Sequence, residues 1–173
     1  MDTLFELLKF ILPALIVFLT AYYTIKHFLQ NDQKKRLLEI RKDNQQVIMP
    51  VRLQAYERVA LLLERLVPDT LINRVHKNGM SARLLQEKLL QTIRQEFDHN
   101  LSQQVYISDN AWALVKNAKE EIIKLVNIAS SKVKDDAAGR ELCRVILEIM
   151  MRLEKLPTQV ALDYLKKEIR QVF

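Results

Sequence analysis

The side chains able to do covalent chemistry are few and scattered in this 173-residue chain. Its three histidines are His27, His76 and His99, and its one cysteine is Cys143. Nucleophilic catalysis needs a base beside the nucleophile, and no neighbouring pair of this kind stands in the sequence. Cys143 follows Leu142 at the edge of an apolar helical seam, which is typical of a partly buried small side chain. The sequence therefore predicts no catalytic residue and a protein that is not an enzyme.

One metal-like pattern is present at residues 96–99, which spell Glu-x-x-His. This spacing places Glu96 and His99 on one helix face, but ferritin-like dimetal sites need a second copy and two further glutamates. No second copy occurs. Gly79 and Gly139 are isolated, so no glycine-rich phosphate loop can form, and a lone cysteine excludes a multi-cysteine metal site. We expect no metal and no cofactor.

The composition predicts an all-α fold. Hydrophobic residues make up 49% of the chain, charged residues 28%, and only two residues are glycine. Helical spacing of apolar residues predicts a first long helix ending near Met49, then helices over 51–66 and 71–77, and longer ones starting after Ser81, at Ser108 or Asp109, after Asp135 or Asp136, and at Thr158. Prolines 50, 68 and 157 separate several of them. Short connections predict an antiparallel bundle of about five to six helices.

The predicted core consists of apolar side chains that repeat every three or four residues. They are Leu53, Tyr56, Ala60, Leu63 and Val67; Leu85, Leu89, Ile93, Phe97 and Leu101; Ala111, Val115, Ala118, Ile122, Leu125, Ala129 and Val133; Leu142, Ile146, Ile149, Leu153 and Leu156; and Leu162, Leu165 and Ile169.

The N-terminal stretch predicts a single transmembrane helix. The sixteen residues from Phe10 to Ile25 carry no charge. They span about 24 Å as a helix, and apolar flanks are needed to reach the ~30 Å hydrocarbon core. A buried helix of a soluble protein and a cleaved signal peptide are the alternatives. The residues expected at the membrane interfaces are Lys9, Tyr22, Tyr23, Lys26, Lys34, Lys35 and Arg36.

Cations concentrated after this stretch predict the N-terminus outside and the C-terminal part in the cytoplasm of a bacterial inner membrane. The expected organisation is an anchor over 1–29, a basic juxtamembrane helix over 30–49 and a cytoplasmic bundle over 50–173. The lipid bilayer is then one partner.

A basic stretch lies in the bundle at residues 74–94, with Glu87 as its one acidic residue. It suits phosphate, RNA or a membrane surface, although a solvated face is the alternative. Without interleaved aromatic residues, nucleic acid is not the expected partner. The candidate partner-binding residues are the five cations of this stretch and two aromatic residues at a helix break. They are Arg74, Lys77, Arg83, Lys88, Arg94, Tyr106 and Trp112.

Two segments carry a resemblance to a known family. The run Pro50-Val-Arg-Leu-Gln-Ala-Tyr-Glu-Arg-Val59, and the run Tyr106-Ile-Ser-Asp-Asn-Ala-Trp112 with Asn117-Ala-Lys-Glu-Glu121, resemble segments of a family of short bacterial membrane proteins that has no known function. The resemblance covers nearly the whole chain. It implies a membrane-anchored helical domain and no particular activity.

The expected function is that of a non-enzymatic, membrane-tethered interaction or scaffold domain that binds a protein partner or self-associates. One alternative is an accessory subunit of a larger inner-membrane complex, such as a transporter or an energy-coupling machine. The other is membrane-tethered binding of nucleic acid or the ribosome, which predicts affinity that falls steeply with salt.

Overall fold

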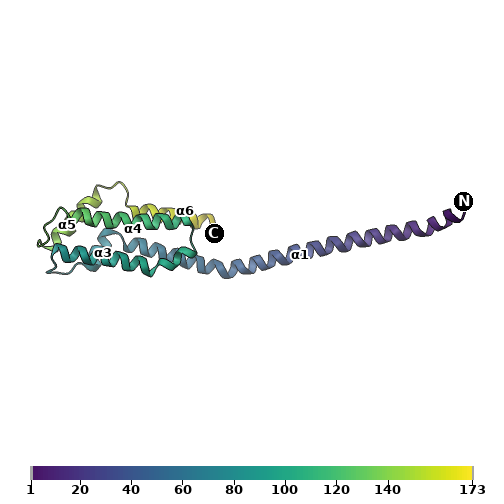
Figure 1. Ribbon diagram of the computed structural model, residues 1–173, viewed down its shortest axis with the longest axis horizontal. Helices are drawn as coiled ribbons and strands as arrows, with labels where there is room; N and C mark the ends of the chain where they lie inside the picture. Colours follow the sequence, from purple (N-terminus) through teal and green to yellow (C-terminus); the bar gives the residue numbers. More distant parts are fainter. Residues whose placement is uncertain (1, 173) are drawn as a thin grey trace. The chain divides into compact units, whose positions relative to one another are not determined.

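The computed structural model describes the backbone of residues 2–172 and the side chains of residues 15–33, 35–36 and 46–171. Its regular elements are all helical (Figure 1): α1 over Asp2–Arg65, α2 over Pro68–Val75, α3 over Ala82–His99, the 3-10 helix η1 over Leu101–Val105, α4 over Asp109–Ser130, α5 over Gly139–Met151 and α6 over Pro157–Val172. The all-α prediction is confirmed. Within these residues the β-type pairing is one isolated bridge between Ser81 and Ala138.

The first helix is longer than predicted because it continues through Pro50. A proline inside a helix removes one hydrogen bond to the residue four positions earlier, at a cost of about 3 kcal/mol. That residue is Gln46, which is exposed, so water can replace the missing donor. The chain nevertheless divides into two compact units at this proline, Met1–Met49 and Pro50–Phe173.

The prediction of a transmembrane helix is wrong. Among the residues that the structure describes, no helix is both long enough and apolar enough to cross a membrane. The uncharged run is only about 24 Å long as a helix, short of a ~30 Å hydrocarbon core, and Lys9 and Lys26 bound it closely. The single-pass topology, the inner-membrane location and the outward N-terminus, which all depended on this helix, are corrected with it.

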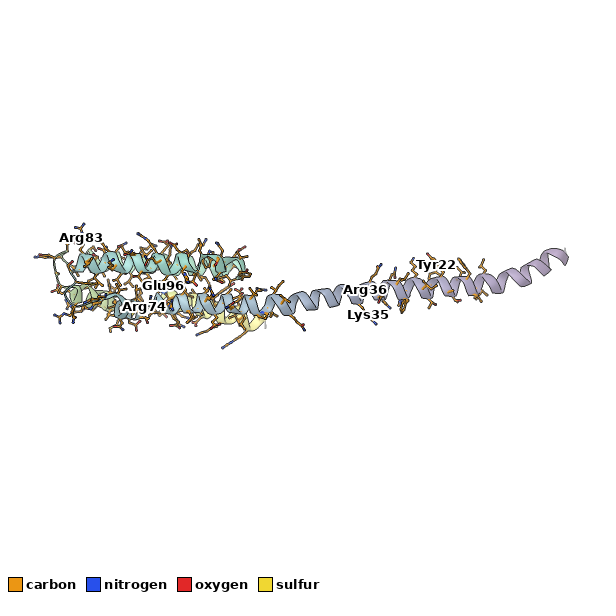
Figure 2. The ribbon with its side chains drawn as sticks, turned by 90° about the horizontal axis from the view of Figure 1, so that it is seen from below. Tyr22, Lys35, Arg36, Arg74, Arg83 and Glu96 are labelled. Carbon is orange, nitrogen blue, oxygen red and sulfur yellow. The ribbon has the colours of Figure 1, made fainter. Side chains whose placement is uncertain are left out.

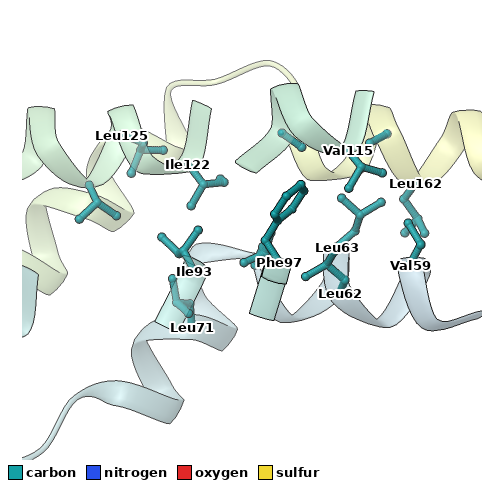
Figure 3. Packing of buried hydrophobic residues seen from close by; sticks show 14 of the residues in the cluster. Val59, Leu62, Leu63, Leu71, Ile93, Phe97, Val115, Ile122, Leu125 and Leu162 are labelled. Carbon is teal, nitrogen blue, oxygen red and sulfur yellow. The ribbon is translucent and has the colours of Figure 1, made fainter. Parts of the chain in front are cut away.

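The second unit is a helical bundle built around one apolar core. Helix α4 lies beside α3, α5 and α6, and α3 also contacts α2 and α5. Figure 3 shows Val59 and Leu63 of α1, Phe97 of α3, Val115 of α4 and Leu162 of α6 meeting in this core. Each fully buried Leu, Ile or Phe contributes about 1.5–3 kcal/mol relative to an exposed one. Burial of these stripes is therefore what holds the helices together.

The cap predicted at Ser81 is present, and of the two caps predicted for the helix near 108, Ser108 and Asp109, the structure has Ser108. Ser81 Oγ accepts a hydrogen bond from the Leu84 N–H at 3.3 Å, and Ser108 Oγ accepts one from the Ala111 N–H at 3.1 Å. Such caps satisfy backbone donors that lack a partner within the helix. Helix α2 instead begins with Pro68 in its first turn. Because proline has no N–H to satisfy, it suits this position.

The start of α5 differs from the prediction, since Ala138 precedes it without a side-chain cap. Here backbone pairing replaces capping. The Gly139 N–H donates to the Met80 carbonyl at 2.8 Å, and the Ala82 N–H donates to the Ala137 carbonyl at 2.8 Å. A Cβ at Gly139 would lie 3.0 Å from the Met80 oxygen, so glycine permits this close approach.

Some predicted core positions lie outside the core because their helices end earlier than expected. Helix α3 ends at His99, and Leu101 is exposed in η1. Helix α5 ends at Met151, and Leu153 is exposed in the following turn. Leu53 is also exposed, on the outer face of α1. The stripes from Leu85 to Phe97 and from Ala111 to Ala129 are buried as predicted.

Candidate interaction surfaces and buried polar clusters

One cluster joins three helices through a single carboxylate. Arg65 Nη1 from α1 donates to Glu96 Oε2 at 3.2 Å, and Arg74 from α2 donates to Glu96 Oε1. Arg74 and Glu96 lie close together in Figure 2. The Glu96 side chain is only 13% exposed. Both carboxylate oxygens therefore bind guanidinium groups and link the end of α1 and α2 to α3.

The Glu-x-x-His pattern at residues 96–99 lies in this ion-pair cluster. His99 lines the same shallow cleft, but Glu96 is already held by two cations. Among the residues that the structure describes, no three His, Cys, Asp or Glu side chains converge as metal ligands. The chemistry of this carboxylate is thus that of an ion-pair acceptor.

Opposing effects act on the pKa of the Glu96 carboxyl. Burial raises this pKa, but hydrogen bonds and charges from Arg74 and Arg65 outweigh burial and lower it below the usual value of glutamate. The unfolded chain therefore binds a proton here at a higher pH than the folded chain does. This contribution to stability is present above the usual glutamate pKa and is lost as the pH falls through the lowered one.

We expect Glu96→Gln to reduce the loss of stability on acidification. The wild type should lose about 1 kcal/mol more than the variant between neutral and acidic pH, a modest value because both arginines are partly exposed. Urea unfolding followed by circular dichroism at several pH values measures the difference. Glu87→Gln is the control, because Glu87 forms only an exposed pair with Arg83. Parallel pH profiles of wild type and Glu96→Gln would contradict the assignment.

A second polar cluster lies where α1, α4 and α6 meet. The Tyr56 hydroxyl donates to Glu168 Oε1, and Ser108 Oγ donates to Glu168 Oε2 at 2.7 Å. Tyr56 is fully buried. Burial, then the hydrogen bond and charge of Glu168, raise the pKa of Tyr56 to about 12, although Arg52 opposes the shift. Glu168 thus fastens the end of α6 to two other helices, and the sequence offered no signal for this pairing.

The basic stretch is not a single patch. Arg74 pairs with Glu96, and Arg83 contacts both Glu87 and Asp135. The hydrogen bond from Lys119 is the main cause of the lowered pKa of Glu120, and the charge of Arg94 nearby adds to it. Lys88 donates to Gln91, and it projects from α3 about 140° around the axis from Arg83. Lys77 is exposed after the end of α2. Acidic neighbours thus accompany three of the five cations, and they weaken the positive electrostatic potential that the five could form together.

The two aromatic candidates have different environments. Trp112 is buried and stacks on Phe97 with ring centroids 5.2 Å apart, while Lys119 Nζ lies 4.4 Å from the Phe97 ring centroid. Trp112 therefore belongs to the core. Tyr106 is exposed, and its carbonyl accepts a hydrogen bond from Arg52 Nε at 3.2 Å.

Exposed apolar residues flank both partners of this Arg52–Tyr106 contact in the sequence, and we call them the η1 patch. Val105 is 76% exposed, and the other members are 40–46% exposed. The patch consists of Val51, Leu53, Leu101, Val105 and Tyr106. Sequence reasoning included only Tyr106. The available signal was the failure of the helical pattern at 104–107, where Val105 and Tyr106 belong to no apolar stripe.

The residues expected at membrane interfaces interact along α1 itself. Lys26 Nζ lies 5.9 Å from the Tyr22 ring centroid, and Tyr23 meets Tyr22 edge-on at 5.7 Å. Arg36 Nε donates to Asp32 at 2.9 Å, and Lys35 is exposed (Figure 2). The side chains of Lys9 and Lys34 lie outside the described residues.

The fold and these clusters define an all-α protein with a helical bundle in which polar clusters join helices. The chain belongs to a family of unknown function (DUF7935), whose sequence model matches residues 2–172. The resemblance to a family without known function is confirmed, while bacterial origin stays a prediction. Comparison with curated proteins and with solved structures finds no match.

Proposed function

We propose that the bundle is a non-enzymatic protein-interaction domain and that the η1 patch is its contact surface. The observation that supports this most is that exposed apolar residues flank both Arg52 and Tyr106, whose contact joins α1 to the segment after η1. Exposed apolar clusters on a folded domain are typical of binding surfaces. Tyr and Arg are also the residue types enriched at interfaces.

The composition of the patch favours a protein partner. Contact with its apolar side chains would release water, and Arg52 and the Tyr106 hydroxyl beside them can supply polar contacts.

The double variant Leu53→Glu/Val105→Glu tests the proposal. The tagged full chain is used in pull-downs with quantitative mass spectrometry, in which wild type should capture a partner at fixed stoichiometry. We expect the variant to capture about tenfold less of this partner, or lower still. Two charges would have to be desolvated in the contact.

Ile128→Glu/Met151→Glu is the matched control, because it adds the same charge at residues 52% and 78% exposed outside the patch. It should retain the partner, and thermal unfolding should show that both variants fold. Equal capture by both variants, or no stoichiometric partner for the wild type, would refute the role of the patch.

A further inference from the structure

The first unit carries an unusual amount of exposed apolar surface. Among its described side chains, large apolar residues are concentrated between positions 15 and 29. The buried apolar core that the second unit forms begins at Ala55. The exposed residues are Leu15, Ile16, Val17, Phe18, Leu19, Tyr22, Tyr23, Ile25, Phe28 and Leu29. An exposed apolar surface of this kind is typical of a site that binds another molecule.

Part of this surface has the spacing of a coiled-coil seam. The side chains 51–68% exposed at Leu15, Phe18, Tyr22, Ile25 and Leu29 are separated by 3, 4, 3 and 4 residues. That alternation places them along one line of a helix, as in the a and d positions of a heptad. In the sequence the same spacing continues upstream through Leu4, Leu8 and Ile11.

The seam ends in an ion pair. Its next two positions are Asp32 and Arg36, which bind each other within the helix at 2.9 Å. Leu19 and Phe28 occupy the e and g positions beside the seam and widen it, whereas Val17 and Tyr23 project from the far side of the helix. The apolar seam therefore has a defined end at Asp32.

The size of this surface suits a second copy of the chain. A buried Leu, Ile or Phe removes about 60–120 Å² of apolar area from water, if 1.5–3 kcal/mol corresponds to 25 cal/mol per Å². The five described seam positions with Leu19 and Phe28, on each of two helices, then bury roughly 840–1,700 Å², which reaches the size of a stable interface.

We propose that two copies of this chain associate through the seam of α1 formed by Leu15, Phe18, Tyr22, Ile25 and Leu29. Each seam side chain packs against the seam of the partner helix, which removes from water the apolar line that the chain leaves exposed. This contact is separate from the η1 patch, so one can fail without the other.

Sedimentation equilibrium of the full chain over a range of concentrations tests the proposal. Wild type should reach the mass of a dimer. Phe18→Glu/Ile25→Glu should raise the dimer dissociation constant by at least about a hundredfold, because it buries like charges in the seam.

Val17→Glu/Tyr23→Glu adds the same charge at residues 66% and 65% exposed on the far side of α1. It should change the dissociation constant by less than about threefold. A monomer at all concentrations overturns the proposal. So does equal loss of association in both variants, which would mean that the helix is covered all round.

Flotation with phosphatidylcholine and phosphatidylglycerol vesicles separates a lipid surface from a second copy. Wild type that floats with the vesicles yet stays monomeric overturns the proposal. A dimer that Leu53→Glu/Val105→Glu leaves intact supports the seam, whatever the outcome for the η1 patch.

Discussion

Trp112→Ala is expected to lower the free energy of unfolding by about 3–5 kcal/mol, the usual range for removing a buried aromatic side chain. The indole is buried and stacks on Phe97 at 5.2 Å, so alanine would leave a cavity between α3 and α4. Total stability of a domain is about 5–15 kcal/mol. The variant should therefore lose a large part of its stability.

Urea unfolding followed by circular dichroism measures this effect without depending on tryptophan fluorescence. Trp112→Phe should recover much of the loss because it refills part of the cavity and can still stack. Tyr106→Ala, on an exposed aromatic residue, should change stability by less than about 0.5 kcal/mol. An unchanged midpoint for Trp112→Ala would place the indole outside the core and restore it as a candidate contact residue.

Glu168→Ala is expected to cost about 2–3 kcal/mol, because it leaves the buried Tyr56 hydroxyl without its acceptor and removes a partner of Ser108. The end of α6 would be loosened first, since this carboxylate links it to α1 and α4. Hydrogen exchange should accordingly increase in α6 before it increases in α3.

A double-mutant cycle with Tyr56→Phe separates this hydrogen bond from other effects of the substitution. Tyr56→Phe alone should destabilise, whereas in the Glu168→Ala background it should be nearly neutral or favourable, because it removes an unsatisfied hydroxyl. Strictly additive costs would show that the two side chains do not act together. Spectrophotometric titration offers a second check, because the raised pKa of Tyr56 should move toward the ordinary value of about 10 in Glu168→Ala.

Buried helix faces were largely predictable from the sequence. The stripe from Ala111 to Ala129 repeats every three or four residues without interruption, and one helix buries all of it. Ser81 and Ser108 were recognisable as caps because a hydroxyl before an apolar periodic run satisfies a local need. Such signals act over a few residues and need no knowledge of the partner helix.

Helix ends and the membrane assignment were less predictable. Pro50 suggested a break, yet α1 continues through it because only one backbone bond is lost. The uncharged run suggested a membrane span, but the run alone is too short to cross the hydrocarbon core, and the prediction depended on apolar residues in its flanks. Leu101 and Leu153 continued their stripes in sequence and lie beyond the ends of their helices.

The sequence alone determined that the chain is helical, which faces are apolar and that few groups could do chemistry, because periodicity and composition are local properties. The tertiary structure decided which polar side chains meet. Glu96 binds Arg65 and Arg74, and Glu168 binds Tyr56 and Ser108, across 22 to 112 positions of sequence. Such pairs depend on how helices pack, and a side chain's own segment carries no record of its distant partner. The same packing buried Trp112 and left Val105 exposed, and so determined which residues are free to contact another molecule.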